Sequence, residues 1–250
     1  MKPVLRLVPV ALLQLLVSSA LWAQTPAAPP APAAAPVATL STQPDGARYG
    51  TDPSAAQLLE KAQLRIAKLK GPCEVIFIGD SITQNWKDGA IWQKYYGARH
   101  ALNYGVSSDT TQNVLFRLNY DGLKTLKPKV AVILIGTNNT AKNTPAEIAA
   151  GVRAVIDKTR SLFPASKIIL LDILPTARRT QIVVEANELI AKLSDEKTIF
   201  RLNLGEKMVK EGDSWRGLDK GRLHLTEEGY RIWAETMEPL LARLLGDTKS

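Results

Sequence analysis

Five apolar runs of strand length alternate with segments of helical period through most of this chain. The runs are continuous and rich in Val and Ile, which is typical of strands buried on both faces of a parallel sheet. They predict strands at residues 74–78, 101–104, 130–135, 167–171 and 198–202. Helical patterns lie at residues 55–69, 89–96, 110–118, 145–162, 183–193 and 227–245. This alternation predicts a three-layer α/β/α sandwich with a mostly parallel five-stranded sheet.

Two of the expected helices begin with recognisable capping sequences. Residues 144–147 read Thr-Pro-Ala-Glu, which combines a capping box with proline in the first turn. Residues 226–228 read Thr-Glu-Glu, in which a capping threonine precedes two acids that complement the helix dipole. These signals predict where the two helices begin.

The N-terminal region differs in composition from the rest of the chain. In residues 1–23, basic residues precede an apolar run at 8–21, which is the pattern of a secretory signal peptide and is too short for an ordinary membrane span. An uncleaved anchor is the alternative. Residues 24–48 are rich in Ala and Pro and predict a semi-extended linker, followed by one folded domain at 49–250. We therefore expect a secreted or periplasmic protein with no membrane span after signal cleavage.

Charge and cysteine content limit the partners and cofactors. The formal net charge is +8, but the basic residues are interspersed with acids, so the sequence does not indicate a nucleic-acid surface. Cys73 is the one cysteine of the sequence and forms no intrachain disulfide; its place at the start of an apolar run predicts burial. The sequence has neither zinc-site spacing nor a glycine-rich phosphate loop, and it implies no metal or organic cofactor.

Polar clusters follow three of the expected strands. Residues 79–81 read Gly-Asp-Ser, residues 105–109 read Gly-Val-Ser-Ser-Asp, and residues 136–139 read Gly-Thr-Asn-Asn. In an open parallel sheet, the carboxyl ends of the strands meet at one edge, where binding and catalytic sites form. We therefore expect the three clusters to lie close together.

Ser81 and His224 are the candidates for nucleophilic chemistry. A serine directly after a strand can be activated by a base, although alone it is more often a helix cap. His224, one of two histidines, precedes the last expected helix and is on its own equally a surface histidine. His100 precedes the second expected strand and is interpreted as structural. Asn138 follows the third strand, where its amide either donates to an oxyanion or forms the turn.

In this order and at these separations, the clusters resemble the blocks of the SGNH, or GDSL-type, hydrolase family. The likeness is to the branch of platelet-activating-factor acetylhydrolase catalytic subunits and bacterial carbohydrate acetylesterases. Residues 79–81 match the first block, 100–118 resemble the second, 136–138 match the third and His224 matches the fifth, so the likeness spans 74–245. It implies a flavodoxin-like SGNH hydrolase fold. Together with the signal-peptide pattern, it indicates a secreted bacterial member.

The resemblance also implies a mechanism. Ser81 would attack an ester carbonyl, and His224 would act as its general base and later protonate the leaving group. Backbone N–H groups at Ser81 and Ser108, with the Asn138 amide, would form the oxyanion hole. Ser108 stands where the family has glycine, so its N–H serves only if serine adopts the backbone φ required there.

The triad acid is where the chain departs most from the family pattern. The family's acid lies three residues before the histidine, and Gly221 occupies that place; the nearest carboxylate is Asp219. Such an acid fixes the imidazole tautomer and stabilises the imidazolium. Three alternatives follow: Asp219 is the acid and reaches back through a longer loop, a backbone carbonyl replaces it, or the enzyme is weak or inactive.

The resulting hypothesis is an exported serine esterase that hydrolyses short-chain esters, acetyl esters first among them, on carbohydrate or another small alcohol. The alternative is a catalytically impaired SGNH-fold protein that binds a glycan or a protein partner on the same surface. Transacylation through the same acyl-enzyme is a third possibility, which the sequence does not separate from hydrolysis.

Overall fold

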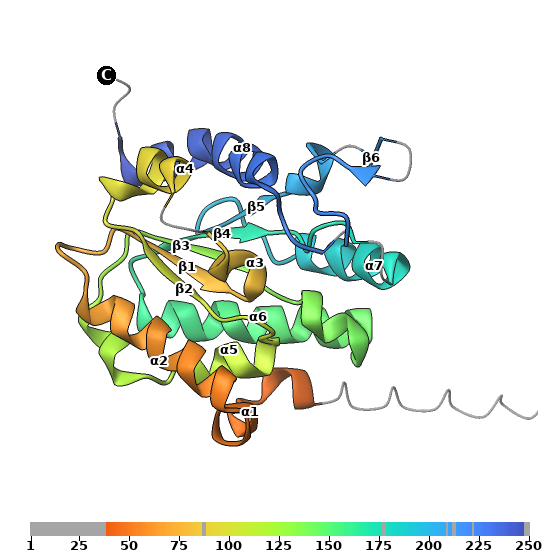
Figure 1. Ribbon diagram of the computed structural model, residues 1–250, viewed down its shortest axis with the longest axis horizontal. Coiled ribbons are helices and arrows are strands. Elements are labelled where there is room, and N and C mark those ends of the chain that lie inside the picture. Colours follow the sequence, from red (N-terminus) through yellow and green to blue (C-terminus); the bar gives the residue numbers. More distant parts are fainter. Residues whose placement is uncertain are drawn as a thin grey trace, which may run out of the picture. The chain divides into compact units, whose positions relative to one another are not determined.

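The computed structural model describes residues 39–86, 89–176, 179–208, 210–211, 214–221 and 223–247. Its centre is a five-stranded sheet in the order β2-β1-β3-β4-β5, and every neighbouring pair is parallel (Figure 1). The strands are β1 (Val75–Gly79), β2 (Leu102–Gly105), β3 (Val130–Leu134), β4 (Lys167–Leu171) and β5 (Ile199–Leu202). This is the doubly wound, flavodoxin-like order, in which the chain changes direction at β1. The predicted α/β class and five-stranded sheet are confirmed.

Helices cover both faces of the sheet. The longer ones are α2 (Pro53–Ala67), α5 (Thr111–Arg117), α6 (Pro145–Leu162), α7 (Thr180–Ala191) and α8 (Glu227–Leu245). The short elements are η1 (Thr39–Thr42), α1 (Ala47–Thr51), α3 (Ser81–Gln84), α4 (Ala90–Trp92), η2 (Gln93–Gly97), η3 (Asp121–Thr125), η4 (Thr137–Ala141) and η5 (Leu204–Glu206), with a hairpin of β6 (Lys210–Glu211) and β7 (Ser214–Trp215). In Figure 1, α8 and α4 lie above the sheet and α2, α5 and α6 lie below it.

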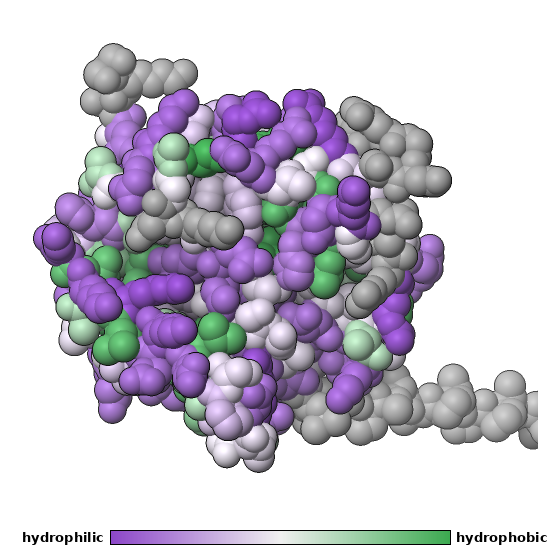
Figure 2. All heavy atoms as spheres, in the orientation of Figure 1, coloured by the Kyte–Doolittle hydropathy of each residue, from purple (hydrophilic) through white to green (hydrophobic). Residues whose placement is uncertain are grey.

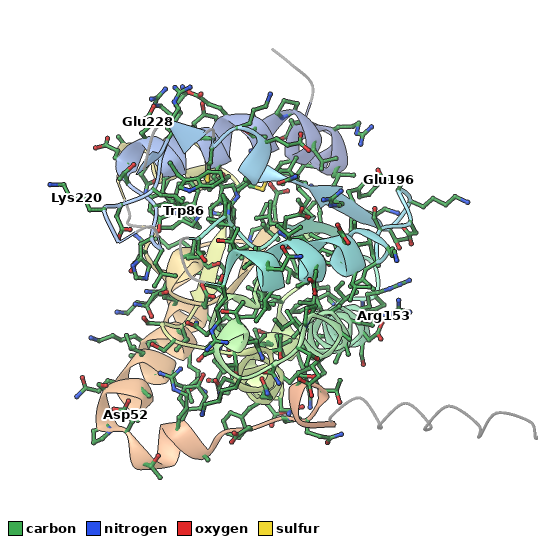
Figure 3. All side chains as sticks on the ribbon, turned by 90° about the vertical axis from the view of Figure 1, so that its right-hand side faces the viewer. Asp52, Trp86, Arg153, Glu196, Lys220 and Glu228 are labelled. Atoms are coloured by element: carbon green, nitrogen blue, oxygen red, sulfur yellow. The ribbon has the colours of Figure 1, made fainter. Side chains whose placement is uncertain are left out.

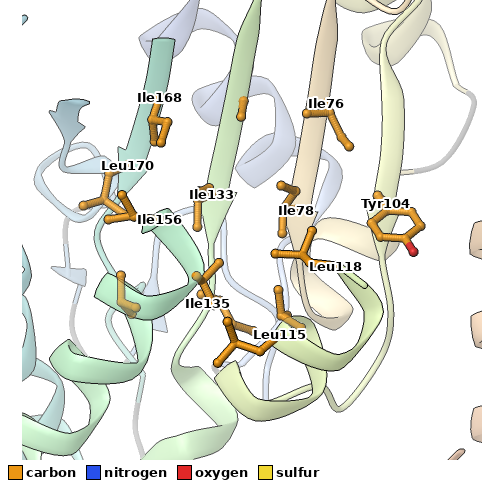
Figure 4. Close-up of a cluster of buried hydrophobic side chains, with 14 of the residues drawn as sticks. Ile76, Ile78, Tyr104, Leu115, Leu118, Ile133, Ile135, Ile156, Ile168 and Leu170 are labelled. Atoms are coloured by element: carbon orange, nitrogen blue, oxygen red, sulfur yellow. The ribbon is translucent and has the colours of Figure 1, made fainter. Parts of the chain in front are cut away.

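Alternate strand residues supply two separate cores. Ile76 and Ile78 of β1 pack with the layer that contains α2, α5, α6 and α7, and Figure 4 shows them in one cluster with Leu118 and Ile133. Val75 and Phe77 point the other way and pack with α4, η2 and α8. Because successive strand side chains alternate between faces and both faces are covered, every residue of β1 is buried. This burial explains the continuous apolar runs in the sequence.

The capping signals produce the expected helix starts. The Glu147 N–H donates to Thr144 Oγ1 (3.3 Å), and the Thr144 N–H donates to Glu147 Oε2 (2.8 Å), so the capping box at the start of α6 is formed. The Thr226 side chain accepts from the Gly229 N–H at the start of α8. The helix expected at 89–96 is different: α4 ends after one turn and η2 continues it as a π-helical turn.

The folded part of the chain begins before the predicted boundary at residue 49. The Asn113 side chain of α5 donates to Asp45 O (2.9 Å), Thr111 Oγ1 donates to Ser41 O (3.0 Å), and Ser41 is fully buried. Residues 39–48, predicted as linker from composition, therefore pack on the domain because their backbone groups are hydrogen-bonded to α5. The predicted signal peptide (1–23) and the rest of the predicted linker lie outside the described residues.

The face of the molecule drawn in Figure 2 is predominantly polar. Figure 2 shows hydrophilic residues over most of one face, with hydrophobic residues in small separate areas. Cys73 is buried, as predicted, and burial raises the pKa of its thiol to about 11. Within the described residues, no helix has both the length and the apolar character that a bilayer span requires.

Candidate active site

The three polar clusters meet at the carboxyl-end edge of the sheet, as the strand order requires. Ser81 begins α3 two residues after β1, Asn138 lies in η4 after β3, and Ser108 lies in the loop after β2. The Asn138 side chain contacts both neighbouring clusters, because Nδ2 lies 2.9 Å from Asp109 O and 3.5 Å from Asp80 Oδ2. His100 precedes β2 and therefore lies at the opposite edge.

Ser81 and His224 are in direct contact across 143 positions of sequence. Ser81 Oγ lies 3.0 Å from His224 Nε2, which is hydrogen-bonding distance. The loop that carries His224 is held at both ends: Leu218 bridges to Leu225, and the Thr226 N–H donates to Gly217 O (2.9 Å). The sequence-predicted nucleophile and base are therefore brought together in the geometry that allows imidazole to remove the serine proton.

Asp219 is the carboxylate that faces the other imidazole nitrogen. Its Oδ2 lies 3.7 Å from His224 Nδ1, which is longer than a hydrogen bond, while Oδ1 accepts from the backbone N–H groups of Leu223 (3.1 Å) and His224 (3.3 Å). Both side chains of the pair are more than one-third exposed. Gly221 lies in the turn between them, and Lys220 points outward into solvent (Figure 3).

A backbone carbonyl was the second alternative for orienting the ring. Within the described part of the chain, no carbonyl oxygen accepts a hydrogen bond from His224 Nδ1. Catalytic hydrogen bonds are often long before substrate binds, so a separation of 3.7 Å is compatible with a role for Asp219. The geometry therefore favours Asp219 over a carbonyl as the partner of Nδ1.

The backbone N–H groups of Ser81 and Ser108 have no acceptor among the residues that the structure describes. Ser81 N–H is the first of α3, and Ser108 N–H lies in the loop after β2; within the described residues neither donates a hydrogen bond. Ser108 has φ +64, so serine does adopt the left-handed conformation that the glycine of the family pattern would favour. The Asn138 amide is the third candidate donor to an oxyanion, and its Nδ2 also lies within hydrogen-bonding distance of Asp109 O and Asp80 Oδ2.

Asp80 is a buried carboxyl next to the nucleophile. It is 1% exposed, and its Oδ1 accepts from the Ile82 N–H (2.9 Å) as the N-cap of α3. Burial, with a smaller contribution from the nearby Asp109 carboxylate, raises the pKa of Asp80 to about 7 against the opposing effect of the hydrogen bonds. The sequence identified Asp80 only as part of the Gly-Asp-Ser motif. Its burial between β1 and Asn138 depends on the tertiary structure and could not be predicted from the motif.

A buried charge cluster supports the loop after β2. Asp109 accepts from Arg117 Nε (2.5 Å), Tyr49 Oη (2.5 Å) and Arg48 Nη1 (2.7 Å). Arg117 also donates to Tyr104 O (2.7 Å) and to Gly79 O (3.1 Å). Sequence reasoning missed these supports, although an arginine on the apolar face of α5, three residues after Val114, was a signal of burial. Arg48 lay in the predicted linker and gave no signal.

A pocket of about 580 Å³ includes Leu225, the residue after His224, in its wall. Its wall combines the end of α3, α4 and the start of α8, and consists of Asn85, Trp86, Gly89, Ala90, Ile91, Trp92, Leu225, Glu227 and Tyr230. Trp86 lies beneath α8 in Figure 3. The wall combines aromatic and aliphatic side chains with the polar Asn85 and Glu227, which suits a small acyl or alcohol group. Within the described residues, no group of three or more His, Cys, Asp or Glu is arranged to hold a metal ion.

Comparison with known proteins agrees with this fold. The model of the GDSL-like lipase/acylhydrolase family matches residues 77–232, and the chain belongs to that family. It is 32% identical to platelet-activating factor acetylhydrolase IB subunit alpha2 of Homo sapiens over 184 residues, which cover 70% of this chain and 79% of the relative. The resemblance noted in the sequence is thereby confirmed at the level of family.

Solved structures share the fold at lower identity. A GDSL-like lipase from Bacteroides thetaiotaomicron superposes with a TM-score of 0.62 at 20% identity, over 74% of this chain and 97% of that chain. A carbohydrate esterase family 3 protein from Talaromyces cellulolyticus gives a TM-score of 0.53 at 16% identity, over 70% and 99% of the two chains. Family and fold together support an esterase-type hydrolase in general.

Proposed function

We propose that this protein is an exported serine esterase that removes short acyl groups, acetyl first among them, from a carbohydrate or another small alcohol. The observation that carries the proposal is the 3.0 Å contact between Ser81 Oγ and His224 Nε2. The relative that is named an acetylhydrolase supports an acetyl group. The carbohydrate esterase neighbour and the signal-peptide pattern support an extracellular or envelope carbohydrate.

In the proposed reaction, His224 Nε2 takes the proton of Ser81 as Oγ attacks the ester carbonyl. The N–H groups of Ser81 and Ser108 and the Asn138 amide donate to the oxyanion; one such donor is typically worth about 10²–10³-fold in kcat. The imidazolium then protonates the leaving alcohol. Water, activated by the same imidazole, hydrolyses the acyl-enzyme and restores Ser81. Asp219 stabilises the imidazolium through Nδ1. No step requires a cofactor.

The test is hydrolysis of p-nitrophenyl acetate by the mature protein and four variants. We expect Ser81→Ala and His224→Ala to lower kcat by about 10³-fold or more, because either change removes the nucleophile–base pair. Asp219→Asn should lower kcat by roughly 10- to 100-fold, less than in a tight buried triad, because the Nδ1 contact is long and partly exposed. Asp157→Asn, at an exposed carboxylate of α6, is the control and should match the parent.

The alternative function, glycan or protein binding without catalysis, rests on Gly221 and on the 3.7 Å separation at Asp219. Equal background rates in the parent and all variants would favour it.

Release of acetate from an acetylated polysaccharide, compared between the parent and Ser81→Ala, tests the carbohydrate assignment. Acetylated alcohol products in the same assay would indicate transacylation. N-terminal sequencing of the protein from the cell envelope or medium tests export and predicts a start after residue 23.

A further inference from the structure

Arg48 reaches the active-site loop from outside the segment that the family model matches. It is the second residue of α1 and precedes residue 77 by 29 positions. Its Nη1 donates to Ser107 O at 2.9 Å and to Asp109 Oδ1 at 2.7 Å, and its side chain is 22% exposed. The N-terminal segment thus supplies a cation to the loop that carries Ser108.

The contact with Ser107 O controls the direction of the Ser108 N–H. These two groups belong to one planar peptide unit, in which C=O and N–H point in opposite directions. Fixing the carbonyl therefore fixes the N–H. The preceding peptide is also held, because the Ser107 N–H donates to Gln84 Oε1 (2.7 Å). The Ser108 N–H itself donates to no acceptor in the described residues.

The conformation held in this way is costly for a serine. At φ +64, a residue with a Cβ is less stable by about 1–2 kcal/mol than in the right-handed or extended regions. Rotation of the peptide between residues 107 and 108 would relieve that strain and turn the N–H away. Asp109 keeps Arg117 and Tyr49 without Arg48, whereas Ser107 O has no other donor in the described residues. The loss of Arg48 would therefore release the peptide between residues 107 and 108, while Asp109 would keep its other partners.

We propose that Arg48 is a positioning residue of the oxyanion hole, which holds the Ser107–Ser108 peptide with its N–H directed to the oxyanion. This inference rests on the proposed function, in which Ser108 is one of the oxyanion donors. It assigns to the N-terminal segment the positioning of this carbonyl, which no described residue between 77 and 232 contacts as a hydrogen-bond donor.

The kinetic test compares Arg48→Met with Tyr49→Phe. Methionine keeps much of the length of the arginine side chain but removes its hydrogen-bond donors. We therefore expect kcat on p-nitrophenyl acetate to fall roughly 10- to 100-fold, which is the range for partial loss of one oxyanion donor. KM should change less than about twofold. Tyr49→Phe removes a hydrogen bond to the same Asp109 oxygen but leaves Ser107 held. Its kcat should stay within about twofold of the parent, and equal losses in both variants would overturn the proposal.

A second variant tests the role of backbone strain. In Arg48→Met combined with Ser108→Gly, glycine adopts φ +64 without the Cβ penalty, so the N–H direction is more often kept. We expect this double variant to recover kcat at least about threefold over Arg48→Met. If both proteins are folded and kcat does not recover, Arg48 does not act by orienting the peptide between residues 107 and 108.

A spectroscopic arm is independent of turnover. In protein labelled with ¹⁵N-serine, the Ser108 amide and its coupling to Hα report φ directly. Arg48→Met, made in a Ser81→Ala background, should move or split this resonance, while Tyr49→Phe should leave it in place. An unmoved resonance overturns the inference. Failure of the proposed function would appear separately, as parent activity that does not depend on Ser81.

Discussion

Asp80 is a carboxyl group whose burial makes the stability of the protein depend on pH. With a folded pKa of about 7 against 3.8 for an ordinary aspartate, the folded state keeps a proton that the unfolded chain has lost between these values. The stability that Asp80 contributes is therefore fully present below about pH 4 and falls as the pH rises towards 7.

We predict that Asp80→Asn abolishes this dependence. Relative to the parent, the variant should gain up to about 4 kcal/mol between pH 4 and pH 8, from about 1.4 kcal/mol per pH unit over the titration range. Urea unfolding of both proteins at pH 4, 6 and 8 measures the difference, in which the other titrating groups cancel. A constant difference across this range would mean that Asp80 is ionised throughout.

Ser108 provides a second residue-scale prediction. Ser108→Gly should make the protein more stable by roughly 0.5–1 kcal/mol, because relief of the left-handed strain exceeds the added entropy of the unfolded chain. Ser107→Gly is the matched control at a neighbouring residue without positive φ, and should be less stable by a similar amount. Urea unfolding midpoints check both, and a loss of stability in both variants would contradict the strain argument.

At the scale of elements, Arg117 joins α5 to two strands. Its guanidinium is fully buried and donates to Gly79 O at the end of β1, to Tyr104 O in β2 and to Asp109. The carboxyl ends of β1 and β2, which are paired neighbours in the sheet, carry the nucleophile and the Ser108 loop, and this one side chain is hydrogen-bonded to both strands there. Removing one partner of a buried ion pair is strongly destabilising, because it leaves the other charge buried without compensation.

We predict that Arg117→Met costs about 3–5 kcal/mol of unfolding free energy, because it removes the guanidinium donor from Tyr104 O and Gly79 O, of which Gly79 O keeps the Val106 N–H, and weakens the neutralisation of Asp109. Arg153→Met removes a comparable side chain from an exposed pair with Asp157 on α6 and should cost less than about 0.5 kcal/mol. Chemical denaturation of the two variants beside the parent provides the measurement. Similar small losses in both would show that the cluster contributes little.

At the scale of the whole molecule, the N-terminal segment is part of the folded domain. Tyr49 is 8% exposed and stacks on Phe116 of α5 with ring centroids 5.7 Å apart, and Ser41 and Asp45 accept hydrogen bonds from α5. Tyr49, Ser41 and Asp45 precede the family-model match, which begins at residue 77, whereas α5 lies within it.

We predict that a chain beginning at residue 53 is less stable than one beginning at residue 39 by about 3 kcal/mol or more, from the loss of a buried tyrosine and several hydrogen bonds. Thermal unfolding of the two truncated chains measures this difference, and their kcat values test the role of Arg48 at the same time. Equal melting temperatures would mean that residues 39–52 are only loosely associated.

Much of the fold was predictable because its signals are local. The β1 run, the capping box at residues 144–147 and the polar clusters after β1, β2 and β3 each depend on a few neighbouring residues. Ser81, Asn138 and His224 could be selected because the parallel-sheet rule places strand ends together and because the family blocks recur in order. The predicted boundary at residue 49 was wrong. Residues 39–48 pack on the domain because their carbonyl groups accept hydrogen bonds from side chains of α5, and composition does not reveal such contacts.

The sequence by itself determined the layers, the parallel sheet and the edge at which the site forms, because hydrophobic period and strand ends are properties of short segments. Tertiary structure alone decided which carboxylate faces His224, since four residues of loop lie between Asp219 and His224 and spacing does not fix where a loop turns. It also decided the burial of Asp80 and the reach of Arg48 to Ser107, because both depend on contacts between segments far apart in the chain.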